Sequence, residues 1–330
     1  MKTKLLPALT LILALTLILT QPANAAPLNL TIKTNKPTYT ANEFCEILGN
    51  LTLNDEPVEG ALVALQVNNP KGDPYIMRTL TTGTPPPQTW TLEITEFITC
   101  DSSGNPKTSF PRGGEMGFKI TIKNNAATTH NYTLIINLFY GNTIPYKFLI
   151  ASKSTIDGQK SRTITIWPIL IPDNAPIGNA TAYASLLSGL PAENGLPYCP
   201  EKQTTYQITA SSGNPAPIIT PQPPQTGKIN LTIYIASGKA WKGNYTIYAS
   251  TRYEYYVTTT QSTYEVKLIG DFNEDNIVDI SDLSAVASRF GKSEGDPGYN
   301  PIYDLDKDGQ ILISDVARVA KSFGATLLDP

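Results

Sequence analysis

The sequence has few of the residues that most catalytic and nucleic-acid-binding sites require. Among 330 residues it contains one histidine, His130, and three cysteines. One histidine leaves little material for a Ser-His-Asp triad or for a metal centre built on several histidines. Lys and Arg total 25 against 28 Asp and Glu, so charge is nearly balanced and no basic patch is available to neutralise phosphates. These shortages argue against a nucleic-acid-binding protein and against most hydrolase mechanisms.

Acidic side chains are present but scattered. A glycosidase needs two carboxylates that face each other across a cleft. Glu43, Glu93, Glu96 and Glu115 lie in or beside predicted strands, and nothing in their spacing singles out a pair. The sequence has neither a Gly-rich phosphate loop nor a nucleophile elbow. We therefore predict that the chain is not an enzyme, and that His130 has a solvated role in a hairpin turn.

Long apolar runs are confined to the N-terminus. A basic start precedes a largely apolar run from Leu5 to Leu19, and small residues at 23–25 fit a signal-peptidase site. We predict that residues 1–25 form a signal peptide cleaved after Ala25, with an uncleaved membrane anchor as the alternative. The longest later run, Ile164–Ile171, is interrupted by a Trp-Pro pair and is predicted to be a buried strand. The mature protein is thus expected to be secreted, extracellular or attached to the cell surface, without a transmembrane segment.

Cysteine is scarce and odd in number. Strand alternation places Cys45 on the same face as Ile47, which predicts a small buried core residue. Cys100 and Cys199 lie beside turn-like sequences at the two ends of one segment, and an oxidising compartment favours their pairing. We predict a Cys100–Cys199 disulfide, which would leave one free thiol.

Asn-X-Ser/Thr sequons occur six times, at Asn29, Asn50, Asn131, Asn179, Asn230 and Asn244. Several would arise by chance in a chain rich in Asn and Thr. Behind a signal sequence they fit a glycosylated surface protein.

Composition and turn residues predict a mainly β body. Thr, Tyr, Ile and Val are abundant, and Pro and Gly recur at short intervals. Four strands are predicted in the first segment, at 28–34, 44–52, 61–67 and 75–81. A middle segment, 90–209, offers about seven more, and a third segment, 229–268, offers three. The first segment alone is too short for a two-sheet sandwich.

These strand numbers predict two immunoglobulin-like β-sandwich domains, one inserted in the other. Residues 26–84 and 226–269 would form a discontinuous sandwich, 85–210 a second one, and 211–225 a Pro-rich linker. An internal repeat supports related halves, because Gly178–Ser185 and Gly243–Ser250 differ only at their third and fifth places. Three separate β modules in a row are the alternative.

A loose motif also runs through the first segment. It reads Thr34-Asn35-Lys36-Pro37-Thr38-Tyr39, followed by Glu43, Gly49 and Pro57–Val63. This pattern resembles immunoglobulin-like modules of the macroglobulin type. In that family such modules serve as spacers, ligand-binding surfaces or structural units of cell-surface proteins, so the resemblance implies a fold and not an activity.

The motif that carries chemistry begins at Gly270, where the composition becomes acidic and low in Thr and Pro. Calcium takes six to eight oxygens, which a 12-residue loop supplies from positions 1, 3, 5, 7, 9 and 12. Position 6 needs a sharp turn, which Asn276 allows, and Val278 follows as the apolar anchor. The predicted ligands of this first loop are Asp271, Asn273, Asp275, Ile277 (through its carbonyl), Asp279 and Asp282.

A second loop repeats the pattern, with Gly309 at the turn and Ile311 as the anchor. Its predicted ligands are Asp304, Asp306, Asp308, Gln310 (through its carbonyl) and Asp315. Position 9 is Leu312, whose side chain offers no oxygen. We therefore predict two calcium (Ca²⁺) sites, of which the second binds more weakly. Spaced aspartates without a metal are the alternative, but two aligned loops of this kind would seldom arise by chance.

Each loop is followed by a segment with helical spacing, 282–291 and 315–324. Apolar residues recur at intervals of three and four, and Gly291 and Gly324 are natural stops. The apolar positions are Leu283, Val286, Ala287 and Phe290 in the first segment and Val316, Val319, Ala320 and Phe323 in the second. No helix is expected before the first loop, because a predicted strand runs straight into Gly270.

Two loop–helix units, Asp at position 12 and the connector at 293–302 together resemble a type I dockerin domain. The resemblance covers Gly270 to Gly324 and implies a small calcium-dependent module, 270–330, that binds a cohesin-domain protein. Closely spaced acids repel one another without a cation, so calcium is expected to couple to folding. In that family, loop positions 10 and 11 and the following helix contact the cohesin. Carried over, the partner-binding residues are Ile280, Ser281, Ser288, Arg289, Ile313, Ser314, Lys321 and Ser322.

Together these features predict a secreted, non-catalytic surface protein that docks through its dockerin onto a cohesin-type partner, with the sandwiches as spacer or adhesion surface. The overall plan resembles secreted surface proteins of archaea. The alternative is a carbohydrate-binding accessory component of an extracellular polysaccharide-degrading complex. Tyr253-Glu254-Tyr255-Tyr256 with Trp241 would then form an aromatic platform, although aromatics packed in a sandwich are the commoner case.

Overall fold

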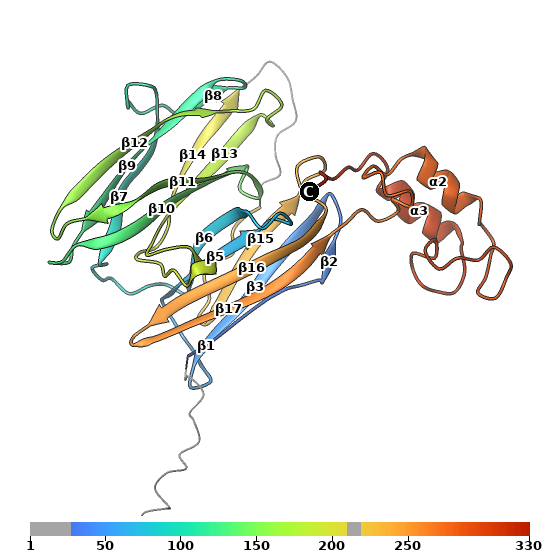
Figure 1. Cartoon of the computed structure of the whole chain (residues 1–330), viewed down its shortest axis with the longest axis horizontal. Helices are drawn as coiled ribbons and strands as arrows, with labels where there is room; N and C mark the ends of the chain where they lie inside the picture. The colour runs from blue at the N-terminus through green and yellow to red at the C-terminus, as the bar shows by residue number, and fades with distance from the viewer. Residues whose placement is uncertain (1–27, 210–218) are drawn as a thin grey trace, which may run out of the picture.

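The computed structural model describes residues 28–209 and 219–330, and this part of the chain is mainly β (Figure 1). The predicted signal peptide with its cleavage site, and residues 211–218 of the predicted linker, lie outside the described residues. Among the helices described, none has the length and apolarity to cross a membrane.

Strands from the first and third segments form one sandwich. They are β1 (Leu28–Thr34), β2 (Thr38–Tyr39), β3 (Glu43–Leu53), β4 (Glu56–Pro57), β5 (Ala61–Asn68), β6 (Pro74–Thr82), β15 (Lys228–Ile235), β16 (Gly243–Tyr253) and β17 (Tyr256–Val266). One sheet has the order β1-β3-β15, with β4 beside β3, and the other has the order β2-β17-β16-β5-β6. The antiparallel pairs β3–β15 and β5–β16 join the two segments.

The middle segment forms a second sandwich. Its strands are β7 (Leu92–Cys100), β8 (Ser109–Pro111), β9 (Glu115–Asn124), β10 (His130–Tyr140), β11 (Ile144–Ile156), β12 (Ser161–Leu170), β13 (Gly178–Leu187) and β14 (Lys202–Thr209). A five-stranded sheet has the order β11-β10-β13-β14-β8, and a three-stranded sheet has the order β12-β9-β7. A short 3₁₀ turn, η1 (Pro191–Glu193), connects β13 to β14.

Burial patterns explain how the two sandwiches meet. β1 alternates buried and exposed residues, as expected of a strand with one face in water. β5, β10 and β13 are buried on both faces along most of their length. Their second faces lie in the interface, where Ala64 and Met77 pack with Ile135 and Leu187.

Polar contacts complete this interface. The Arg78 guanidinium pairs with the Glu201 carboxylate at 2.6 Å and lies 3.5 Å from the Tyr183 ring centroid. The Asn137 side-chain oxygen accepts a hydrogen bond from the Met77 N–H at 2.9 Å, which satisfies an outward group of edge strand β6. The interface therefore fixes one sandwich against the other.

The apolar run Ile164–Ile171 is a strand for most of its length, as predicted, but only part of it is buried, at Ile169 and Ile171. It lies in β12, an edge strand of its sheet, where Leu170 is 57% exposed. The pairing with β9 is irregular between Ile166 and Ile169, because the intervening Pro168 has no N–H to donate.

The predicted disulfide is wrong. Cys45, Cys100 and Cys199 are all free and buried. The Cys199 thiol lies against the backbone of Ile94, near the start of β7, whereas Cys100 ends that strand. Six residues of a strand span roughly 20 Å, and bridged cysteines have Cα atoms within about 7 Å. Turn-like flanking sequences carry no information about this distance.

We expect a thiol assay on the unfolded protein to count three free thiols. In the folded protein all three should react slowly, because burial raises the pKa of Cys45 and of Cys199 to about 12 and also raises that of Cys100. A count of one thiol in the unfolded, unreduced protein would instead restore the Cys100–Cys199 bridge.

Candidate calcium-binding docking module

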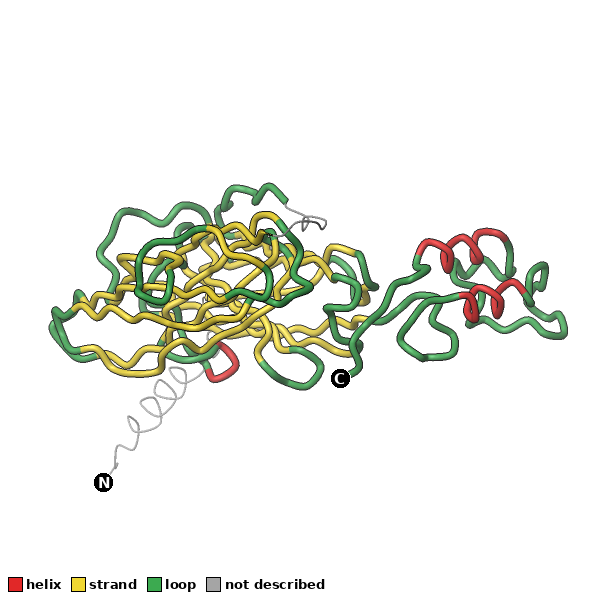
Figure 2. The backbone as a smooth tube through the Cα atoms, turned by 90° about the horizontal axis from the view of Figure 1, so that it is seen from above, coloured by secondary structure: helices red, strands yellow, loops and turns green. Residues whose placement is uncertain are grey.

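The C-terminal module follows the first sandwich without an intervening helix. β17 ends at Val266, and the two helices are α2 (Ile280–Ala287) and α3 (Ile313–Lys321). They lie side by side beyond the end of the first sandwich (Figures 1 and 2). Val286 and Val319 are fully buried in this module, and Leu283 and Val316 pack beside them.

The two loop–helix units hold each other by exchanging backbone hydrogen bonds. The anchor of the first loop, Val278, donates to the Ala325 carbonyl at 3.0 Å, beyond the second helix. The anchor of the second loop, Ile311, donates to the Lys292 carbonyl at 2.8 Å, beyond the first helix. Each loop thus closes against the chain that leaves the other unit, so neither unit is complete without its partner.

The first loop is folded around its own carboxylates. Asp271 accepts hydrogen bonds from the N–H groups of Asp275 and Asn276, both at 3.1 Å. Asp282, at position 12, accepts from Phe272 at 2.7 Å and from Asp279 at 3.0 Å. Asn276 has φ 67°, which is the left-handed conformation predicted for position 6.

The second loop repeats this geometry residue by residue. Asp304 accepts from Asp308 at 3.2 Å and from Gly309 at 2.9 Å, and Gly309 has φ 87°. Asp315 accepts from Leu305 at 2.7 Å and from Leu312 at 2.8 Å. The sequence spacing therefore produces the same turn twice.

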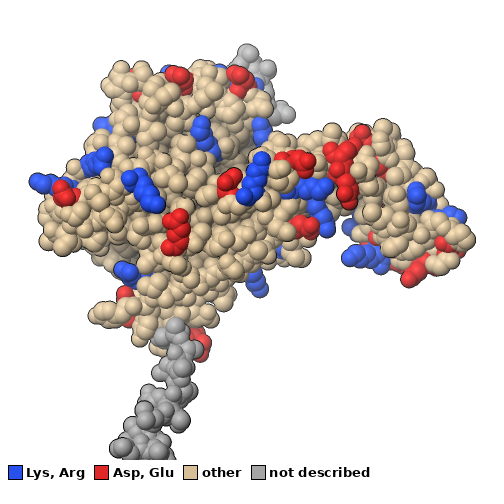
Figure 3. Space-filling model, in the orientation of Figure 1, with Lys and Arg blue, Asp and Glu red and all other residues tan. Residues whose placement is uncertain are grey.

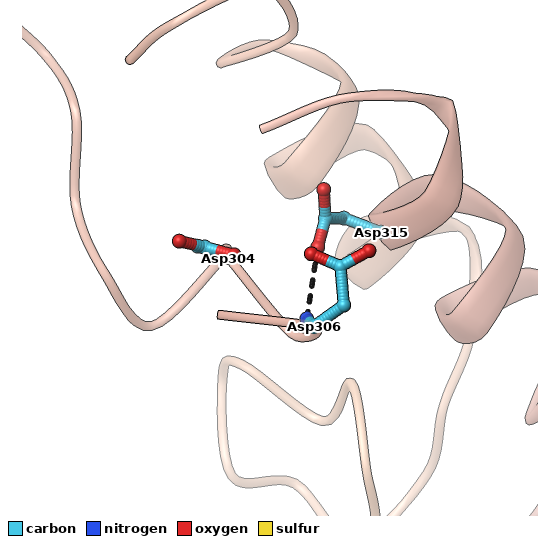
Figure 4. A group of neighbouring side chains, drawn as sticks. All are labelled: Asp304, Asp306 and Asp315. Carbon is cyan, nitrogen blue, oxygen red and sulfur yellow. Dashed lines mark hydrogen bonds between the residues drawn. The ribbon is translucent and has the colours of Figure 1, made fainter. Parts of the chain in front are cut away.

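Three carboxylates converge in the second loop. Asp304, Asp306 and Asp315 bring oxygen atoms within 4.8 Å of one another, and Figure 4 shows Asp306 beside Asp315. Among the described residues, Asp306 Oδ1 is buried without a hydrogen-bond partner. An orphaned carboxylate oxygen in a cluster of hard oxygen donors fits a calcium ion. In the first loop, position 3 is Asn273, whose amide oxygen takes the place of the carboxylate.

Electrostatics also favour a cation. Burial raises the pKa of Asp271 above its ordinary value, and the nearby Asp282 and Asp275 raise it further. In the second loop, the Tyr299 hydroxyl donates to Asp304 at 2.7 Å. This bond lowers the pKa of Asp304 and raises that of Tyr299 to about 12. Ionised carboxylates packed this closely repel one another, and a divalent cation would offset that cost.

The weaker calcium binding predicted for the second loop stays a prediction, but the two loops differ in structure at position 9. In the first unit, Asp279 caps α2 by accepting from the Ser281 N–H at 2.7 Å. Leu312 has the equivalent place before α3 and makes no side-chain cap. Position 9 therefore lacks both an oxygen for calcium and an N-cap.

Most of the predicted partner-binding residues are accessible. Ile280 and Ile313 are 62% and 70% exposed, and Ser281, Ser288 and Lys321 are exposed as well. Ser314 and Ser322 are half-buried. Arg289 is also half-buried, because its guanidinium stacks on the Tyr303 ring at 4.4 Å. Arg289 thus contributes to the packing of the module as well as to its surface.

Two of the apolar positions predicted from helical spacing lie at the surface. Phe290 and Phe323 are each 55% exposed, and they occupy corresponding places in the two units. The helices end at Ala287 and Lys321, before these positions, so the helical period does not extend to them. Large exposed apolar side chains thus stand at equivalent places in the two units.

The module is tied to the sandwich at both ends. At its start, the Ile269 N–H donates to the Thr40 hydroxyl at 3.3 Å. After α3, Gly238 donates to the Thr326 carbonyl at 2.9 Å, and Leu328 donates to the Ala240 carbonyl at 2.8 Å. The final segment therefore returns to the loop between β15 and β16.

Charge is distributed unevenly between the two parts. On the face shown in Figure 3, Lys, Arg, Asp and Glu are scattered and mixed over the sandwiches. Acidic side chains gather where the C-terminal module joins them.

Comparison with known proteins agrees with this geometry. Residues 269–324 match the family model of the dockerin type I domain. The chain therefore carries a dockerin type I domain at its C-terminal end. A search of curated proteins found no match.

Similar solved structures overlap the chain only in part. They include a type II cohesin–X–dockerin complex from Acetivibrio cellulolyticus, with 22% identity, 30% of this chain and 70% of that chain covered, and a TM-score of 0.17. The C-terminal domain of Wzt has 8% identity, coverage of 38% and 77%, and a TM-score of 0.30. The Pseudomonas fluorescens alkylpurine DNA glycosylase AlkC has 9% identity, coverage of 37% and 32%, and a TM-score of 0.29, so this chain spans about a third of its length.

We expect Leu312→Asp to strengthen the second unit. The new carboxylate would cap α3 as Asp279 caps α2, adding about 1 kcal/mol of stability, and would add an oxygen at position 9. Calorimetric titration with calcium should show tighter binding at one site. Leu312→Ala, which shortens the side chain without adding oxygen, is the matched control. Equal affinities for Leu312→Asp and Leu312→Ala would contradict the role assigned to position 9.

Proposed function

We propose that this protein is a secreted, non-catalytic surface component that docks onto a cohesin-type partner through its calcium-bound dockerin. Two calcium ions would be held by the loop oxygens, and the sandwiches would serve as spacer or adhesion surface. The observation that carries the proposal is that the two loop–helix units present the same residues at their surfaces. Both units begin their helix with Ile-Ser-Asp, and both present the isoleucine to solvent.

A non-catalytic role is supported by how the acidic residues of the sandwiches are used. Glu43 pairs with Lys36 at 3.3 Å, Glu96 pairs with Lys119 at 3.4 Å, and Glu201 is engaged by Arg78 in the interface. Each of these carboxylates is paired with a basic side chain. None of these pairs brings two carboxylates to face each other, which is the arrangement a glycosidase needs.

The near repetition of the two units suggests docking in two orientations related by a half turn. Each single variant, Ile280→Asp or Ile313→Asp, should then retain most of the binding, because the other unit still presents its isoleucine. The double variant should lose binding, since a charge would enter the apolar contact in either orientation. Ile302→Asp, at a 52% exposed place in the connector, is the matched control.

The measurement is a pull-down from the native cell envelope with the full chain, with calcium or with chelator. Cohesin-domain proteins should be captured with calcium by the wild type, both single variants and Ile302→Asp, and released by chelator. Capture that survives chelator, or that the double variant retains, would refute docking through these helices.

A second candidate function is carbohydrate binding, which one cleft favours. The cleft has a volume of about 620 Å³, lies between the sandwiches and is lined by Trp90, Tyr198 and Tyr253 together with His130 and Arg252. Tyr198 lies edge-on to His130, with ring centroids 6.0 Å apart. Aromatic faces beside hydrogen-bonding side chains suit the apolar and hydroxyl faces of sugar rings.

The aromatic platform predicted from the sequence is not this cleft. The prediction is wrong, because its residues do not form one surface. Tyr253 ends β16, whereas Trp241 precedes its first residue, so the length of the strand separates them. Trp241 is half-buried beneath Lys71, whose ammonium lies 4.3 Å from its ring. Tyr255, at the hairpin tip, is 96% exposed and outside the lining of the cleft.

Affinity electrophoresis in gels containing soluble polysaccharides would test the cleft. If it binds glycan, Tyr253→Ala should weaken retention roughly tenfold, while Tyr255→Ala should leave it unchanged. Thermal melting of both variants separates lost contacts from lost folding. Retention that depends on Tyr255 and not on Tyr253 would place binding elsewhere, and no retention by the wild type on any polysaccharide would leave the sandwiches as spacers.

A further inference from the structure

Three of the six sequons share one tripeptide and one sheet. Asn29, Asn50 and Asn230 each begin the sequence Asn-Leu-Thr. They lie in β1, β3 and β15, which are consecutive neighbours in the sheet order β1-β3-β15. The chain thus brings together three identical acceptor sequences from segments far apart in the sequence.

Strand alternation orients the three tripeptides in the same way. The central leucines Leu30, Leu51 and Leu231 are buried in the core of the first sandwich, at 4%, 0% and 4% exposure. The side chains before and after each leucine therefore point to the outer face of the sheet. In agreement, all three asparagines are exposed.

Strand register then gathers the acceptor side chains. In the β1–β3 pair, Asn29 stands opposite Thr52, and Thr31 stands opposite Asn50. In the β3–β15 pair, Asn50 stands opposite Lys228, two residues before Asn230. The three asparagines therefore form one diagonal row across the outer face of this sheet.

The space beside Asn50 and Asn230 can hold a large substituent. A groove of about 690 Å³ runs between this sheet and the segment Pro221–Gln225, and both Asn50 and Asn230 line it. The Lys228 ammonium donates to the Asn50 side-chain oxygen at 2.7 Å, which leaves the amide nitrogen as the atom for a sugar linkage. A sugar attached there would displace no core side chain.

We propose that Asn29, Asn50 and Asn230 are N-glycosylated and that their sugars cover the outer face of the β1-β3-β15 sheet. This inference rests on the extracellular location in the proposed function. The modification joins the amide nitrogen of each asparagine to the first sugar of an oligosaccharide donated from a lipid pyrophosphate, which is the leaving group, and the amide loses one proton. The row runs from Asn29, at the end of the sheet where β1 begins, to Asn230, which stands opposite Leu48 at the middle of β3. The dockerin leaves from the opposite end, where Ile269 contacts Thr40, so the sugars would leave the docking helices uncovered.

The other three sequons provide a comparison within the same chain. Asn131, Asn179 and Asn244 are exposed too, but they do not form a row, because Asn131 and Asn179 lie at opposite ends of the antiparallel pair β10–β13 and Asn244 lies on β16 in the other sandwich. Their sugars would be isolated, and they would not form a continuous cover.

Glycopeptide mass spectrometry of the full-length protein from its native cells tests the proposal, with the culture medium and cell-surface fraction analysed apart from the cytoplasm. Peptides that contain Asn29, Asn50 and Asn230 should each carry an oligosaccharide. Thr31→Ala, Thr52→Ala and Thr232→Ala should each remove one, because the threonine hydroxyl is required by the transferase. Thr259→Ala, at an exposed threonine outside any sequon in the same sandwich, should remove none.

Unmodified asparagines at all three places in protein recovered outside the cell would overturn this proposal and leave calcium-dependent docking intact. Unmodified protein found only in the cytoplasm would overturn the glycosylated face together with the proposed extracellular function. Modified asparagines in a protein that fails to capture a cohesin would overturn only the docking function.

Discussion

Mutual repulsion of closely spaced carboxylates is the constraint on which the docking surface depends. Asp282 and Asp315 are buried at 1% and 0% exposure, and Asp304 at 5%. A protein does not bury ionised carboxylates so completely without compensation. Backbone N–H groups of the loops supply part of it, and a divalent cation bound by the same oxygens would supply the rest. Because position 12 of each loop also lies in the first turn of the following helix, occupancy of the loop and position of the helix are parts of one structure.

The two loop–helix units hold each other in place, so the geometry of each loop also determines the surface that the two helices form together. Val278 and Ile311 each close their loop against the strand-like segment that leaves the other helix. Loss of one ion would therefore disturb both helices. The return of Thr326 and Leu328 to the loop between β15 and β16 connects the module to the sandwich, which itself is fixed to the second sandwich by Arg78 and Glu201. The docking surface is consequently held in a defined orientation and does not hang from a free linker.

Features that depend on neighbours in the sequence could be predicted, and features that depend on distance in space could not. The predicted calcium loops are local, because 12 residues contain all the proposed ligands, and both the turn at Asn276 and the following helix appear in the structure. The predictions of a dockerin and of a mainly β fold were confirmed. Both rest on local patterns, because alternation and turn residues act within a strand and the ligand spacing lies within one loop. The four strands predicted in the first segment agree with β1, β3, β5 and β6 to within one residue. The disulfide between Cys100 and Cys199, by contrast, was predicted wrongly, because the sequence does not give the distance between the two residues. Phe290 and Phe323 were included in the predicted apolar helix faces because helical spacing does not reveal that each helix stops before them.

The measurement that tests the account most directly is a titration of the metal-free, full-length protein with calcium, followed by calorimetry and by far-ultraviolet circular dichroism. The account predicts two bound ions per chain and a gain of helical signal that saturates with them, while the β contribution of the sandwiches stays constant. Absence of binding heat together with an unchanged spectrum would contradict it, because the helices would then form their surface without the ions.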